Sequence, residues 1–331
     1  MNAQPLRLGS RRSPMAVAQS GDVARHVTER TGRQVEIVGV TTLGDVSREH
    51  LTQIGGTGVF VSALRESLLR GEVDFAVHSL KDLPTGSAPA ITLAAVPARD
   101  DPRDALVGRD GAKLADLPAG ARIGTGSPRR AAQLATLRGD IICVPIRGNA
   151  NTRLAKVRDG ELDAVVLAYA GLARIGSTEM VTEIFEPDDM VPAPGQGALA
   201  VECRSEDTGL IGLLSAIDHP ATRAAVTAER SLLAALEAGC SAPIGAYAVL
   251  TDRLQLNGVV LGLRGTTLPA ALERAGGLDV AAASGTIVVR ERGEADAADA
   301  VRLGRELAAR MLSLGAADLI GAKTDRDDAH D

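Results

Sequence analysis

Two stretches of the chain repeat one another, LRLGSRRSPMAVAQ at residues 6–19 and ARIGTGSPRRAAQ at residues 121–133. In each, a short apolar run leads into Gly-Ser or Gly-Thr, then Ser-Pro, then an Ala-rich run, which is typical of a strand, a loop and the start of a helix. A second pair repeats in the same order, GEVDFAVHSLKDL at 71–83 and GELDAVVLAYAGL at 160–172. Helix-like and strand-like segments alternate between them, so the repeats predict two similar α/β domains.

Two segments rich in Pro, Gly and charge connect these halves, VPARDDPRDAL at 96–106 and DDMVPAPGQGALAVECRSED at 188–207. A chain that crosses twice predicts a hinged cleft between the domains, an arrangement of the periplasmic-binding-protein type. After His219, a helical run, strand-like segments and a long amphipathic helix predict a smaller C-terminal α+β domain. The expected boundaries are 1–97 with 198–217 for the first domain, 103–191 for the second and 220–331 for the third.

Length and composition favour a multidomain cytoplasmic protein. The chain has 331 residues, of which 45% are hydrophobic, and this is enough for more than one core. No apolar run approaches the roughly 18 residues of a membrane span, and the N-terminus does not read as a signal segment. The three cysteines, Cys143, Cys203 and Cys240, have no metal-ligand spacing. We therefore expect neither a membrane partner nor a metal.

Positive charge is concentrated in one part of an acidic chain. The net charge is −6, yet residues 122–174 contain nine basic and four acidic side chains, a local charge of +5. A solvated positive surface is the simplest interpretation of such a run. A nucleic-acid site is disfavoured because the chain has no Trp, two Tyr and three Phe on which bases could stack. Small carboxylates or phosphates bound at helix N-termini fit better.

Six motifs, in order and spacing, resemble the porphobilinogen deaminase (hydroxymethylbilane synthase) family over nearly the whole chain. They are HSLKDLP, GTGSPRR, IRGNANTRL, DPRDA, PAPGQGALAVECR and EAGCSAPIGAY. The resemblance implies a transferase of tetrapyrrole biosynthesis that condenses four porphobilinogen molecules head to tail, with loss of ammonia, and releases hydroxymethylbilane. It also implies a dipyrromethane cofactor, attached to Cys240 by a thioether.

The resemblance makes Asp82 the catalytic residue, next to Lys81 where a predicted strand ends. Loss of ammonia from porphobilinogen needs a proton for the amine and a fixed negative charge beside the cationic pyrrole, and one carboxylate can serve both needs. Lys81 would pair with a carboxylate of the cofactor. Without the other motifs, a surface Lys-Asp pair of little energetic weight would be the simpler interpretation.

The remaining expected site residues follow from the acetate and propionate of each pyrrole, which planar guanidinium groups bind bidentately. The cofactor-binding set implied by the resemblance is Cys240, Lys81, Ser13, Ser127, Arg129 and Arg130. The implied substrate-binding set is Arg11, Gln19, Arg147, Arg153, Arg174 and Gln196. Phe60 is expected in a lid that residues 43–60 form over the cleft.

Two alternative functions use the same residues. A non-catalytic two-lobed protein that binds a small polycarboxylate would employ the arginines and the helix starts, but it gives no reason for Cys240 or for the third domain. An RNA-binding accessory protein depends on the arginine cluster alone. We expect a monomer whose partner is the small molecule porphobilinogen and which binds no nucleic acid.

Overall fold

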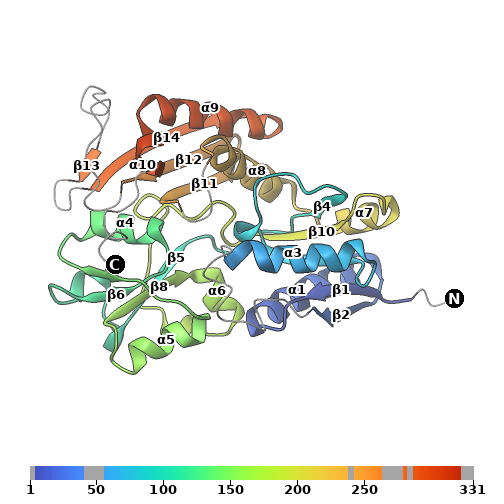
Figure 1. The fold of residues 1–331 in the computed structure, drawn as a ribbon, viewed down its shortest axis with the longest axis horizontal. Helices are drawn as coiled ribbons and strands as arrows, with labels where there is room; N and C mark the ends of the chain where they lie inside the picture. The colour runs from blue at the N-terminus through green and yellow to red at the C-terminus, as the bar shows by residue number, and fades with distance from the viewer. Residues whose placement is uncertain (1–3, 41–55, 238–241, 263–278, 282–285, 322–331) are drawn as a thin grey trace, which may run out of the picture. The chain divides into compact units, whose positions relative to one another are not determined.

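Two compact units make up the computed structural model (Figure 1), which describes residues 4–40, 56–237, 242–262, 279–281 and 286–321. The first unit comprises Met1–Asp100 and Gly195–Arg223, and the second comprises Asp101–Pro194 and Ala224–Asp331. The chain therefore leaves the first unit after Asp100, returns to it at Gly195 and leaves it again after Arg223. The first two of these passages lie within the segments predicted to cross between domains, whereas the exact domain boundaries stay a prediction.

The first unit is built on a five-stranded sheet with the strand order β2-β1-β3-β10-β4. Its strands are β1 (Leu6–Ser10), β2 (Val35–Gly39), β3 (Phe75–Ser79), β4 (Ile91–Ala95) and β10 (Leu199–Arg204). Its helices are α1 (Pro14–Thr31), α3 (Gly56–Leu69) and α7 (Thr208–Leu214). β1 pairs in parallel with β2 and β3, and β10 runs antiparallel between β3 and β4. Phe75, Val77, Val201 and Cys203 form the centre of its core.

The second unit contains a sheet of the same pattern, in the order β7-β6-β8-β5-β9. Its strands are β5 (Asp104–Gly108), β6 (Arg122–Gly124), β7 (Ile142–Val144), β8 (Ala164–Ala168) and β9 (Glu183–Ile184). Its helices are α4 (Pro128–Leu137), α5 (Ala150–Arg158) and α6 (Tyr169–Arg174). β6 is parallel to β7 and β8, and β5 is antiparallel to β8 and β9. The two sheets match strand for strand, which confirms the predicted pair of similar α/β domains.

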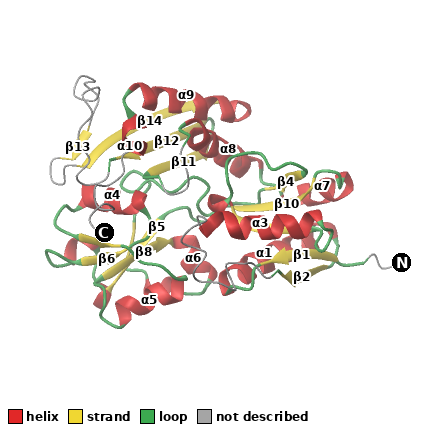
Figure 2. Ribbon diagram, viewed as in Figure 1, coloured by secondary structure: helices red, strands yellow, loops and turns green. Residues whose placement is uncertain are grey.

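The second unit also holds a four-stranded antiparallel sheet, in the order β11-β12-β14-β13. Its strands are β11 (Ile244–Leu250), β12 (Leu254–Leu261), β13 (Asp279–Ala281) and β14 (Thr286–Ala295), and its helices are α8 (Pro220–Ala235), α9 (Ala300–Ser313) and α10 (Ala316–Gly321). In Figure 2, α9 lies along β14 and β12, and its buried Leu303, Leu307 and Met311 recur every fourth residue, as an amphipathic helix requires. The predicted smaller C-terminal α+β domain is confirmed.

Close packing in this domain depends on a glycine of α9. A Cβ atom at Gly304 would lie 2.4 Å from the carbonyl oxygen of Ala228, so only glycine lets α9 approach α8 this closely. Among the helices in the described ranges, none has both the length and the hydropathy to cross a membrane.

Candidate functional site

Both repeated loops end in a serine that caps a helix. Ser13 Oγ accepts a hydrogen bond from Ala16 N at 3.3 Å at the start of α1. Ser127 Oγ accepts one from Arg130 N at 3.4 Å at the start of α4. Each cap fixes where the helix begins and leaves its positive end facing the loop. The start of a helix is a place where backbone N–H groups attract an anion.

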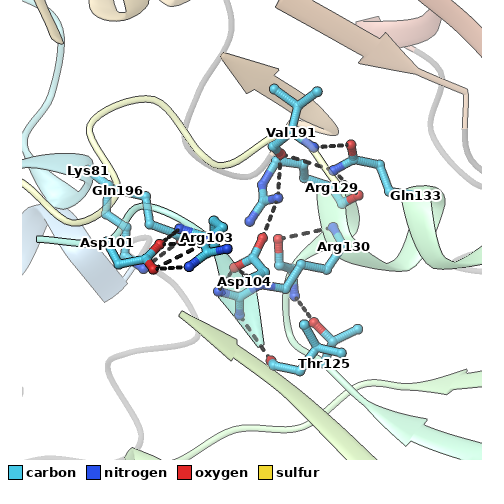
Figure 3. A network of polar contacts seen from close by, with 12 residues as sticks. Lys81, Asp101, Arg103, Asp104, Thr125, Arg129, Arg130, Gln133, Val191 and Gln196 are labelled. Atoms are coloured by element: carbon cyan, nitrogen blue, oxygen red, sulfur yellow. Dashed lines mark hydrogen bonds and ion pairs between the residues drawn. The ribbon is translucent and has the colours of Figure 1, made fainter. Parts of the chain in front are cut away.

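A buried pair of arginines lies in the first turn of α4. Arg129 is 2% exposed and Arg130 is 6% exposed, and both reach Asp104, which is 0% exposed at the start of β5. Arg129 Nη1 lies 2.7 Å from Asp104 Oδ2. Arg130 Nε and Nη2 donate to Asp104 Oδ1 at 2.9 and 2.7 Å (Figure 3). One carboxylate therefore holds two guanidinium groups.

Backbone carbonyl groups complete part of this network. Arg129 Nη1 donates to Val191 O at 2.7 Å, and Arg130 Nη1 donates to Val166 O at 3.1 Å. Gln133 Oε1 accepts from Val191 N at 2.7 Å, and Gln133 Nε2 donates to Val191 O at 3.1 Å (Figure 3). Arg129 Nε and Nη2, by contrast, have no hydrogen-bond partner among the residues that the structure describes.

The network carries more positive than negative charge. Burial opposes ionisation of Asp104, but the charges of Arg129 and Arg130 outweigh it and hold the pKa of Asp104 well below its usual range. Burial lowers the pKa of Arg129, Asp104 raises it, and the charge of Arg130 lowers it further. Buried charges are normally paired because their desolvation is expensive. A pair of cations with one anion is thus suited to receive a further anion.

Of the other arginines predicted in the second unit, Arg153 is linked to this pair. It lies half-buried in α5, and its Nε donates to Gly148 O at 2.9 Å. Burial lowers the pKa of Arg153, and the charge of Arg130 lowers it further. Arg147 is exposed after β7, and Arg174 is half-buried at the end of α6. Arg153 therefore lies in the same positive field as Arg130.

In the first unit, Lys81 and Asp82 lie in a 3₁₀ turn, η2 (Leu80–Asp82), directly after β3. Lys81 Nζ donates to Gln196 Oε1 at 3.2 Å, and Gln196 is 1% exposed. Two residues predicted from separate motifs thus come into contact. Asp82 is half-buried. A Cβ atom at Gly195 would lie 3.3 Å from Lys81 N, so glycine allows the returning chain to pack on this turn.

A buried ion network supports the strand that leads to this turn. Glu202 on β10 is 3% exposed and accepts from Arg65 Nε and Nη2 at 2.9 and 2.7 Å. His78 Nε2, on β3, lies 3.3 Å from the same carboxylate. Burial opposes ionisation of Glu202, but the hydrogen bonds from Arg65 and the proximity of His78 outweigh it and lower the pKa of Glu202 from 4.5 to about 2. The network ties α3, β3 and β10 together.

The remaining predicted residues divide into described and undescribed ones. Arg11 is half-buried directly after β1, and Gln19 is 6% exposed within α1. Cys240, the side chain of Phe60 and most of the predicted lid lie outside the described residues.

Two supporting carboxylates, Asp104 and Glu202, are absent from the predicted set. Both lie inside motifs that were used for the resemblance, DPRDA and PAPGQGALAVECR. The motifs could have identified them as candidates, but a single acidic residue in an apolar strand carries no local sign of which cation it meets. Their partners Arg129, Arg130 and Arg65 are distant in sequence.

Comparisons with known proteins agree with the geometry. A family model described as "Porphobilinogen deaminase, dipyromethane cofactor binding domain" matches residues 6–211, and "Porphobilinogen deaminase, C-terminal domain" matches residues 223–313. The porphobilinogen deaminase of Thermobifida fusca is 58% identical over 323 residues, 97% of each chain. Porphobilinogen deaminase 1 of Streptomyces coelicolor is 57% identical over 333 residues, 98% of this chain and 99% of the other.

Solved structures give a much weaker likeness. A periplasmic substrate-binding protein of an ABC transporter from Coxiella burnetii covers 64% of this chain and 91% of its own, at 16% identity and a TM-score of 0.41. This value is too low to support an argument.

The paired α/β sheets, the capped helix starts and the buried arginine pair define the class as a multidomain α/β protein with buried positive charge in its second unit. Within that class, the chain belongs to the porphobilinogen deaminase family. The predicted family, its transferase class and its activity in tetrapyrrole biosynthesis are confirmed. The alternative of a non-catalytic binding protein is not favoured.

The Glu202 network predicts a pH-dependent contribution to stability. Because its folded-state pKa of about 2 lies below the ordinary 4.5, Glu202 stabilises the fold fully above about pH 5 and loses this contribution as the pH falls toward 2. Glu202→Gln should lower the free energy of unfolding by about 3 kcal/mol at pH 7 and by much less at pH 3. Urea unfolding across this range measures the difference. The exposed Glu206→Gln serves as control, and a pH-independent loss in Glu202→Gln would refute the assignment.

Proposed function

We propose that Asp82 is the proton-transferring carboxylate of the porphobilinogen condensation and that Cys240 anchors the dipyrromethane cofactor through a thioether. The observation that carries the proposal is the surplus of buried positive charge at Arg129 and Arg130, which share one carboxylate, Asp104. Such a surplus suits a ligand with several carboxylates, and each pyrrole of this pathway brings two.

The described residues fit a polycarboxylate cofactor. Arg129 Nε and Nη2 are buried, have no partner in the described part of the chain and form the side of the guanidinium that binds a carboxylate bidentately. We propose that Ser13, Lys81, Ser127, Arg129 and Arg130 hold the cofactor. When bound, dipyrromethane supplies the pyrrole end to which porphobilinogen is added.

The substrate-binding set would act by two kinds of contact. We propose that Arg11, Arg147, Arg153 and Arg174 bind the acetate and propionate groups as ion pairs. The buried amides of Gln19 and Gln196 would contribute neutral hydrogen bonds, which fix orientation without adding charge. Phe60 remains a proposed lid residue.

Asp82 is well placed for a rigid catalytic role. It ends a 3₁₀ turn that is fixed by the hydrogen bond from Leu80 N to Ala198 O at 3.0 Å and by the packing of Gly195. In the proposed step, the Asp82 carboxyl gives its proton to the amine of porphobilinogen, the C–N bond breaks, and its electron pair leaves with ammonia. The carboxylate that remains stabilises the cationic pyrrole.

Asp82→Asn should fold normally and lower kcat by about 10²–10⁴-fold, because the amide neither donates a catalytic proton nor carries a charge. Product formation and circular dichroism are the measurements. Asp110→Asn, whose side chain is 93% exposed, provides the matched control. An Asp82→Asn enzyme within threefold of the parent would exclude the assigned role.

The thioether predicts a mass excess of two pyrrole units on the purified chain, which Cys240→Ser should lack. Burial, with Asp207 nearby, raises the pKa of Cys203 to about 11, so this residue stays a neutral thiol and is not a competing anchor. Cys143→Ser should keep the full adduct and serves as control. Intact-protein mass spectrometry distinguishes these cases, and an active chain without the excess would contradict the proposal.

We also propose that the enzyme works as a cytoplasmic monomer and binds no nucleic acid. Light scattering of the purified chain tests the oligomeric state, since a monomer has a mass of 34.1 kDa. A mass of twice this value at assay concentration would replace the monomer by a dimer.

A further inference from the structure

The carboxylate of Asp104 has a position that no assigned catalytic or binding role explains. It is 0% exposed at the first residue of β5, which pairs with β8 through the register Asp104↔Ala168. Its backbone oxygen also accepts from Phe185 N at 2.9 Å. The side chain is therefore held on a strand that runs antiparallel between β8 and β9. Burial of a carboxylate at such a place needs cationic partners, and α4 provides two.

The contacts of Asp104 are unequal. Oδ1 accepts from Nε and Nη2 of Arg130, which uses the bidentate side of that guanidinium. Oδ2 pairs with Nη1 of Arg129 at 2.7 Å, and Val191 O accepts from the same nitrogen at 2.7 Å. Within the described residues, Arg129 is thus held through Nη1, by two oxygens.

The opposite side of the Arg129 guanidinium makes no hydrogen bond to any residue that the structure describes. Its Nε and Nη2 are buried and have no hydrogen-bond partner in the part of the chain that the structure describes. These two nitrogens point the same way in a planar guanidinium and match the spacing of a carboxylate. Buried donors are rarely left unpaired in folded proteins, so an unused pair indicates a ligand.

We propose that Asp104 is a positioning residue for Arg129: it holds Nη1 together with Val191 and leaves the Nε–Nη2 side directed at a pyrrole carboxylate of the cofactor. This inference rests on the proposed role of Arg129 in cofactor binding. Asp104 engages the bidentate side of Arg130, and this division makes Arg129 the receptor of the pair. Without Asp104, Nη1 of Arg129 would lose its ionic partner among the described residues, and the orientation of Arg129 would be lost.

The first test compares the cofactor content of full-length variants purified from one host. Asp104→Asn keeps the shape of the side chain and removes its charge. Intact mass gives the ratio of loaded to unloaded chains, and thermal melting followed by circular dichroism gives stability. We expect Asp104→Asn and Arg129→Gln each to lower the loaded ratio tenfold or more.

A matched control breaks another ion pair of the same unit. Asp163 lies 2.6 Å from Arg109 Nη2 and accepts from Arg122 N at 2.8 Å. Asp163→Asn should lower the melting temperature and leave the loaded ratio as in the parent. A merely stabilising role for Asp104 would give the same result as this control, so an Asp104→Asn chain that melts early but loads normally would overturn the inference.

The double variant Asp104→Asn/Arg129→Gln tests whether Asp104 acts through Arg129. If Asp104 acts through Arg129, the loaded ratio of the double variant should equal that of Arg129→Gln within about threefold, because effects on one shared interaction do not add. A further tenfold loss would overturn the inference. The same comparison decides the matter if Asp104→Asn alone does not fold, because the double variant removes one charge of each sign.

The proposed function fails in a different way. Normal loading of Arg129→Gln would remove the cofactor role of Arg129 and, with it, the inference. Loss of cofactor loading in Arg129→Gln together with normal loading in Asp104→Asn would leave the proposed function intact. It would exclude only the positioning role of Asp104.

Discussion

Burying a charge is costly unless an opposite charge accompanies it, and this constraint shapes both units of the described structure. In the first unit the constraint is met, because Glu202 on β10 is surrounded by Arg65 and His78. In the second unit it is met only in part, because Asp104 is shared between Arg129 and Arg130. The first arrangement connects α3, β3 and β10, whereas the second has one positive charge more than Asp104 neutralises. A ligand with two carboxylates per pyrrole is of the kind that could neutralise the remaining charge.

The parts of the fold that were predictable are those governed by local sequence. Ser13 and Ser127 cap their helices as the Gly-Ser/Thr…Ser-Pro pattern indicates, because a cap depends only on residues within one turn. The buried runs of β3 and β8 were equally plain, since strands covered on both faces are apolar throughout. The antiparallel insertion of β5 and β10 was not readable in this way. Their neighbours in the sheets are distant in sequence, and strand order is decided by tertiary packing.

In the candidate site, too, local sequence predicts some features and tertiary packing decides the others. A local charge of +5 in residues 122–174 left a solvated surface and an anion site as alternatives, and in the structure Arg129, Arg130 and Arg153 lie in one positive field. Which arginine retains unused donors could not be predicted, because that depends on the direction from which Asp104 and Val191 approach. Lys81 and Gln196 likewise belong to separate motifs, and only the returning chain brings them into contact.

The choice of arginine over lysine at position 129 follows from this geometry. A lysine ammonium is a single point of charge, so contacts with Asp104 and Val191 would leave it one N–H and no pair of parallel donors for a carboxylate. A guanidinium has two sides: Nη1 of Arg129 contacts Asp104 and Val191, while its Nε and Nη2 have no partner among the described residues. The protein contacts fix the plane of the group before a ligand arrives, which reduces the entropy lost on binding. In the proposed cofactor role, the same arginine side chain serves both as a structural partner and as a receptor for carboxylates, in a chain with far more arginine than lysine.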